Sequence, residues 1–120
     1  MTMDEMLAIC DGRTPSAQQF EMFCRDNNLN RSDALDQISL TVARRYLAGA
    51  LSYAIGDGVM NSVFAFATHS EGDIPDVMFR VYSAFDEAEH THHGKYLNVD
   101  LEAEYTRPML ASVLEGIDAV

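Results

Sequence analysis

Apolar residues recur at helical spacing along most of this chain, and one segment carries two apolar stripes instead of one. Between Asn30 and Ile55 the stripes consist of Leu35, Ile38, Val42, Tyr46, Gly49 and Tyr53, and of Leu40, Ala43, Leu47, Ala50, Leu51 and Ala54. A surface helix needs only one apolar stripe, so a helix with two is expected to contact neighbours on several sides. We therefore predict a central helix over about residues 31–55, with Asn30 as its N-terminal cap.

Shorter amphipathic segments flank the predicted central helix on both sides. They are predicted to start at Asp4, Ser16, Val59, Ile74 and Thr106, and Ser16 with Gln19 three residues on is predicted to form a capping box. The turn-forming sequence Gly56-Asp57-Gly58 is predicted to end the central helix, and Thr106 is predicted to cap the last helix. The alternation of apolar and polar residues that is typical of strands is absent, apart from a few short stretches. The chain is therefore predicted to be all-α, a single domain over residues 1–120 with five or six helices.

The length and composition fit one globular domain. The chain has 120 residues, of which 48% are apolar, and this is enough for a packed core. No apolar run approaches the ~18 residues that a membrane-spanning helix needs. The start of the chain, Met1 to Cys10, carries Asp4 and Glu5 but no basic residue, which is unlike a secretory signal peptide. We expect a cytoplasmic protein.

Acidic residues outnumber basic ones by more than two to one, with 19 Asp and Glu against 8 Lys and Arg and a formal net charge of −11. Up to Ser70 there are 8 acidic and 5 basic residues, whereas from Glu71 onward there are 11 acidic and 3 basic. Such a surface repels phosphate backbones and anionic lipids, so nucleic-acid and membrane binding are disfavoured. It attracts a basic partner protein and speeds the encounter. The alternative is that this charge serves solubility alone.

Two residue pairs invite a chemical interpretation that their surroundings do not favour. Cys10 and Cys24 have neither Cys-x-x-Cys spacing nor a histidine at zinc-ligand spacing, so both are predicted to be small buried apolar residues. A disulfide between Cys10 and Cys24 is the alternative. Arg44 and Arg45 are adjacent but lack a glycine-rich phosphate loop. We predict a surface pair in which Arg45 bridges to an acidic neighbour, with an anion-binding site as the alternative.

The histidines near the end of the fifth predicted helix are the strongest candidate for a metal site. Glu89, His90, His92 and His93 could supply nitrogen and oxygen ligands to a single zinc or nickel ion. Two-metal carboxylate bundles need a second Glu-x-x-His pair, which this sequence lacks. The favoured interpretation is that these histidines lie exposed at a helix C-terminus, where the helix dipole favours their charge. We therefore predict no metal and no cofactor.

The sequence carries none of the common hydrolase or nucleotide-binding motifs. It contains no Gly-x-Ser-x-Gly, no His-Glu-x-x-His and no phosphate-binding glycine-rich loop, and no spacing of Ser, His and Asp selects a catalytic triad. Paired carboxylates such as Glu102 and Glu104 could act as acid and base only within a cleft. The chain is therefore predicted not to be an enzyme.

Tyrosines beside carboxylates in the acidic half of the chain indicate a surface for protein recognition. Aromatic rings supply contact area at a low cost in conformational entropy, and the carboxylates steer a basic partner. The predicted docking residues are Asp86, Glu87, Glu89, Glu102 and Glu104 as counter-charges and Tyr105 as the aromatic anchor.

In its length, acidity and helical character, though in no motif, the chain resembles bacterial immunity proteins. This resemblance implies an inhibitor that neutralises a basic toxin, such as a nuclease, by covering its active site. Two alternatives stay open. One is a metal-dependent enzyme or sensor built on Glu89, His90, His92 and His93. The other is a homo-oligomeric structural or regulatory module, in which surplus apolar residues form a dimer interface.

Overall fold

Six α-helices and one π-helical segment form the part of the chain that the computed structural model describes, residues 1–88 and 100–118. The elements are α1 (Met3–Cys10), α2 (Ala17–Asp26), α3 (Arg31–Leu47), α4 (Tyr53–His69), α5 (Asp76–Asp86), the π-helical η2 (Glu102–Thr106) and α6 (Arg107–Asp118). No strand occurs within these residues, so the predicted all-α bundle of five or six helices is confirmed.

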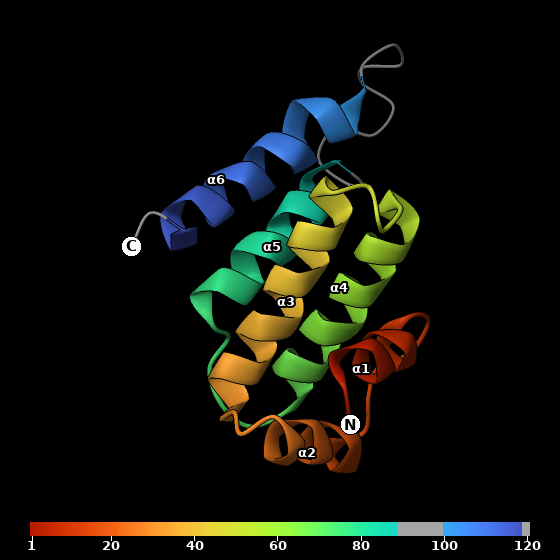
Figure 1. Cartoon of the computed structure of the whole chain (residues 1–120), viewed down its shortest axis with the longest axis vertical. Helices are drawn as coiled ribbons and strands as arrows, with labels where there is room; N and C mark the ends of the chain where they lie inside the picture. Colours follow the sequence, from red (N-terminus) through yellow and green to blue (C-terminus); the bar gives the residue numbers. More distant parts are fainter. Residues whose placement is uncertain (89–99, 119–120) are drawn as a thin grey trace.

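The helices α3, α4 and α5 stand side by side and run alternately up and down (Figure 1). Helix α6 packs against α3 and α5, α1 lies against α4, and α2 contacts α3 near one end of the bundle (Figure 1). The core between the three central helices is apolar and almost free of solvent. Its largest fully buried side chains include Leu35, Ile38, Met60, Val63, Met78, Val81 and Phe85. Helix α3 thus has neighbours on several sides, as its two stripes predict.

The predicted central helix is nevertheless too long at its C-terminal end. Helix α3 ends at Leu47, and Gly49 takes the left-handed conformation with a φ of +81°. The amide of Gly49 donates to the carbonyl of Tyr46, and the amide of Ala50 donates to that of Arg45. These two bonds form a Schellman motif, which terminates a helix at a glycine. Helix α4 then begins at Tyr53, where the hydroxyl of Ser52 caps the amide of Ile55.

Gly56-Asp57-Gly58 does not end a helix, contrary to the prediction, because all three residues lie inside α4. Gly56 has a packing role instead. A β-carbon built on Gly56 would lie 2.9 Å from both Cε1 and Cζ of Phe85, whereas one built on Gly58 would meet nothing within 4 Å. The glycine therefore allows the aromatic ring of α5 to lie directly against the backbone of α4.

The two glycines provide a matched pair of alanine substitutions. Gly56→Ala should lower the free energy of unfolding by about 1–2 kcal/mol, because overpacking against the buried Phe85 ring outweighs the gain in helix propensity. Gly58→Ala, which adds its methyl group in open space, should raise the free energy of unfolding by about 0.5–1 kcal/mol. Urea denaturation followed by circular dichroism measures both. Equal stability of the two variants would show that the Phe85 contact does not require a glycine.

Thr106 does not cap a new helix, because η2 runs directly into α6. Its buried hydroxyl instead donates a hydrogen bond of 2.8 Å to the carbonyl of Ala84 and so ties the start of α6 to α5. The predicted N-terminal caps at Ser16 and Asn30 are confirmed, since each side chain accepts a hydrogen bond from the amide three residues on.

Candidate protein-docking surface

The predicted docking residues that the structure describes gather at one end of the bundle. Asp86 and Glu87 end α5, Glu102, Glu104 and Tyr105 belong to η2, and α5 contacts η2. Glu89 lies outside the described residues, as do His90, His92 and His93 of the candidate metal site. We refer to Asp86, Glu87, Glu102 and Glu104 as the acidic end.

Within the acidic end, Glu102 and Glu104 differ in how accessible their carboxylates are to a partner. Glu102 is half-buried and its Oε1 accepts a hydrogen bond of 2.5 Å from the hydroxyl of Tyr46. The guanidinium of Arg107 lies 3.9 Å from the same oxygen and 5.9 Å from the centre of the Tyr46 ring. Burial raises the pKa of Tyr46, and the hydrogen bond to the Glu102 carboxylate raises it further. Glu102 therefore holds α3 to η2, whereas Glu104 is exposed.

Three aromatic side chains from α4 and α5 form a cluster at the surface, which we call the aromatic cluster. The rings of Phe64 and Tyr82 are stacked, with their centres 4.0 Å apart and their planes 8° from parallel. The ring of Phe79 lies 6.3 Å from that of Phe64 and 6.5 Å from that of Tyr82. Phe79 is 48% exposed, the most of the exposed large apolar side chains in the described structure. Aromatic rings of this exposure are typical anchors of protein interfaces.

The aromatic cluster leads along α5 into the acidic end, and we call the two together the docking strip. Phe79, Tyr82 and Asp86 are spaced by three and four residues, so they lie on the same side of that helix. The aromatic side chains are thus followed, one helical turn on, by a carboxylate. The sequence pattern did not single out Phe79 as a docking residue. The signal that could have found Phe79 is its place beside, rather than on, the buried stripe of Met78, Val81 and Phe85.

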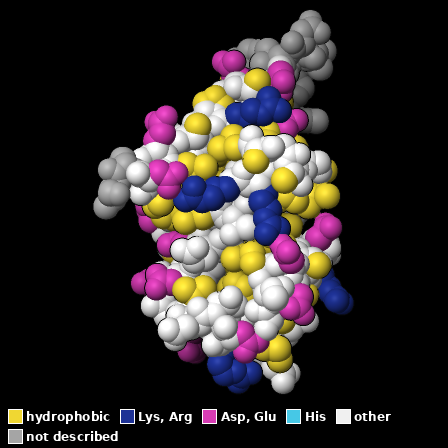
Figure 2. All heavy atoms as spheres, in the orientation of Figure 1, with side chains coloured by type: hydrophobic (Ala, Val, Ile, Leu, Met, Phe, Trp, Pro, Cys, Tyr) yellow, Lys and Arg dark blue, Asp and Glu magenta, His cyan; other side chains and the backbone are white. Residues whose placement is uncertain are grey.

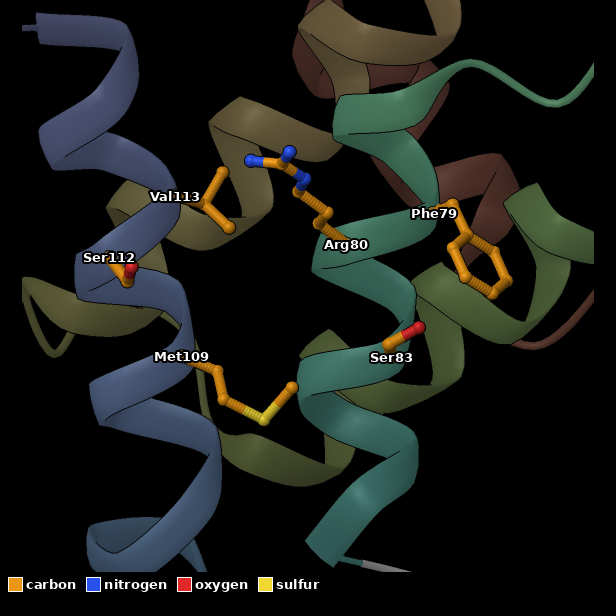
Figure 3. Close-up of a pocket in the computed structure, with 6 residues that line it drawn as sticks. All are labelled: Phe79, Arg80, Ser83, Met109, Ser112 and Val113. Carbon is orange, nitrogen blue, oxygen red and sulfur yellow. The ribbon is translucent and has the colours of Figure 1, made fainter.

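A groove runs along the other side of α5, between this helix and α6 (Figure 3). It has a volume of about 300 Å³ and is lined by Phe79, Arg80, Ser83, Met109, Ser112 and Val113. In Figure 3 the side chain of Met109 reaches from α6 toward α5, while the ring of Phe79 points away from α6. Arg80 is held by Asp76, its Nε 3.0 Å from the carboxylate. The groove is therefore mostly apolar and borders the aromatic cluster.

Negative charge is more widely distributed than the lopsided sequence suggests. Asp26, Asp33, Glu71 and Asp73 lie at the end of the bundle opposite to the acidic end, at the termini of α2 and α3 and in the connection between α4 and α5. On the face drawn in Figure 2, Asp and Glu side chains are spread over the surface and basic side chains lie between several of them. The carboxylates of the described residues are thus not gathered on a single face.

The adjacent arginines are both engaged by carboxylates. Arg45 lies 2.6 Å from Asp4, so the predicted bridge from Arg45 to an acidic neighbour is confirmed. Arg44 forms two hydrogen bonds, of 3.0 and 3.2 Å, with the carboxylate of Asp118. This pairing raises the pKa of Arg44 and lowers the pKa of Asp118. An anion would have to displace these carboxylates, which argues against the anion-binding alternative.

The described residues offer little support for metal or disulfide chemistry. Within residues 1–88 and 100–118, no group of three or more His, Cys, Asp and Glu side chains is arranged to hold a metal ion. Cys10 is buried, Cys24 is half-buried, and both are free thiols. Burial raises the pKa of the Cys10 thiol to about 11 and also raises that of Cys24.

No helix in the described part of the chain is long and apolar enough to cross a membrane.

Comparison with protein-family models, with curated proteins and with solved structures finds no match for this chain. The function must therefore be argued from the surface of the molecule itself.

Proposed function

We propose that this chain is a small protein-binding module that captures a basic protein on the strip formed by the aromatic cluster and the acidic end. In its most specific form it is a cytoplasmic inhibitor of the immunity type. It neutralises a basic toxin, such as a nuclease, by covering the toxin's anion-binding active site. The single observation that carries the proposal is the exposed Phe79, which lies beside the stacked rings of Phe64 and Tyr82 and is followed along α5 by Asp86.

The aromatic cluster supplies the contact that holds a partner. Binding energy at protein interfaces is concentrated in a few large, well-packed side chains, among which tyrosine is enriched. Phe64 and Tyr82 are already stacked, so little side-chain entropy is lost when a partner covers them. Phe79 then presents almost half of its surface to the partner.

The carboxylates supply the preference for a basic partner. A net charge of −11 raises the local concentration of cationic proteins and speeds their association. The same charge repels a second copy of this chain, so the strip suits a basic partner better than it suits a homodimer. Nucleic acid is repelled in the same way, although a nuclease that binds nucleic acid presents the basic surface that this strip complements.

The test uses as its probe the basic protein encoded immediately upstream of this chain. Its affinity, measured by surface plasmon resonance, should fall at least tenfold between ~50 mM and ~500 mM NaCl, because salt screens exposed charges. If that protein is an enzyme, a stoichiometric amount of this chain should abolish its activity. The proposal would be contradicted by an upstream gene that encodes no basic protein, or by an affinity that is equal at both salt concentrations.

A further inference from the structure

A second groove lies between α2 and the C-terminal end of α4, far along the chain from the proposed docking strip; we call it the α2–α4 groove. Its volume is about 500 Å³, and it is lined by Ala17, Phe20, Glu21, Cys24, Arg25, Arg31, Phe66, Ser70 and Glu71. A neighbouring hollow of about 730 Å³ shares Ala17, Glu21, Phe66, Ser70 and Glu71 and adds Thr14, Pro15, Ala65 and His69. Because they share these residues, the two hollows form one elongated groove.

The floor of the α2–α4 groove is apolar. The rings of Phe20 and Phe66 lie with their centres 4.5 Å apart and are both largely buried. Ala17 and Cys24 flank Phe20 on the same face of α2, since these residues are three and four positions away from it. A groove of this size offers an aromatic floor for the apolar part of a small molecule and several polar groups that can orient it.

One end of the groove carries two arginines, neither of which forms an ion pair with a carboxylate of the described structure. Arg25 ends α2 and Arg31 begins α3, so the two guanidinium groups belong to adjacent helix termini. Arg31 donates hydrogen bonds to the carbonyls of Ala67 and Asp73 and to the hydroxyl of Ser70. Its Nε is buried without a hydrogen-bond partner in the described structure.

Among the described residues, four arginines elsewhere pair with carboxylates, whereas Arg25 and Arg31 at this end of the groove, like Arg13, have no such pair. Arg44, Arg45, Arg80 and Arg107 each lie within 4.0 Å of a carboxylate oxygen. Among the described residues, no ion pair joins Arg25 or Arg31 to a carboxylate, although this chain has 19 of them. The groove therefore offers guanidinium charge that the protein itself does not neutralise by direct contact.

We propose that the α2–α4 groove binds a small amphipathic monocarboxylate, such as a medium-chain fatty acid. Its carboxylate lies at Arg25, and its apolar chain lies over Phe20 and Phe66 toward Pro15. Guanidinium groups bind carboxylates with strong, directional hydrogen bonds. Glu21 and Glu71 also line the groove, and their charge disfavours ligands with several negative charges, such as phosphate esters.

The probe for this proposal is decanoate, kept below the concentration at which it forms micelles. Isothermal titration calorimetry should show saturable binding of one decanoate per chain. The Arg25→Gln variant should bind about tenfold more weakly, because it loses a hydrogen bond to a charged group. Arg44→Gln, which makes the same change in net charge at the Asp118 ion pair, should bind decanoate as the unaltered protein does.

Two further measurements place the ligand within the groove. Decanoate should slow the alkylation of Cys24 by iodoacetamide, a reaction that the buried Cys10 does not share. Ala17→Trp should block binding by filling the groove, whereas Gln18→Trp, on the next residue of α2 and outside the lining, should leave it intact. The proposal is overturned if decanoate does not saturate, if Arg25→Gln and Arg44→Gln bind alike, or if Cys24 stays unprotected.

Discussion

An alanine in place of Phe85 should lower the free energy of unfolding by about 3–5 kcal/mol. Phe85 is fully buried, and its ring meets those of Tyr46 and Tyr53 at centre distances of 5.3 and 5.6 Å as well as the backbone of Gly56. Its removal leaves a cavity where α3, α4 and α5 meet, and this rigid junction cannot collapse to fill it. Chemical denaturation of the purified variant measures the loss.

Phe79→Ala is the matched control, because it makes the same chemical change six residues earlier on the same helix. Its side chain is 48% exposed, so the substitution should change the free energy of unfolding by less than about 1 kcal/mol. Similar losses of stability in the two variants would mean that the core is not centred on Phe85.

The same Phe79→Ala substitution should weaken the binding of the basic partner by about 30-fold or more, which corresponds to about 2 kcal/mol. Phe79 is the outermost ring of the aromatic cluster, and a partner that covers it removes a large apolar area from water. The loss should appear mainly as faster dissociation, because the steering charges are unchanged.

Met22→Ala serves as the control for binding. Met22 is 38% exposed on α2, outside the aromatic cluster and the acidic end, so its substitution should leave the affinity within about twofold. A partner that binds Phe79→Ala as tightly as the unaltered protein would remove the aromatic cluster from the interface, even if binding remained sensitive to salt.

The helices and two of their N-terminal caps could be predicted from the sequence because both depend on local chemistry. The spacing of apolar residues predicts the helices, and the side chains of Ser16 and Asn30 act on amides only three residues away. The break in the predicted central helix could not be placed, because Gly49 and Gly56 look alike in an apolar helical pattern. In the structure Gly49 takes the left-handed conformation that ends α3, whereas Gly56 is helical and leaves room for the Phe85 ring.

The candidate site could be predicted only in part, for a similar reason. The sequence identified Asp86, Glu104 and their neighbours as a charged group, and helix packing brings this group together at one end. It could not show that Glu102 is held by Tyr46, because the two residues are 56 positions apart. The place of Phe79 beside the buried stripe of α5 is a local signal, but the degree of its exposure depends on how α4 and α5 pack.

The most direct test of the central claim is a map of the bound surface by nuclear magnetic resonance. Isotope-labelled protein would be titrated with the basic protein encoded upstream, and the shifted backbone amides would be located on the structure. We expect the shifted amides to cluster on α5 from Phe79 to Asp86, near Phe64 on α4, and at Glu104 and Tyr105. Shifts confined to α1 and α2, or no shifts at saturating partner, would contradict it.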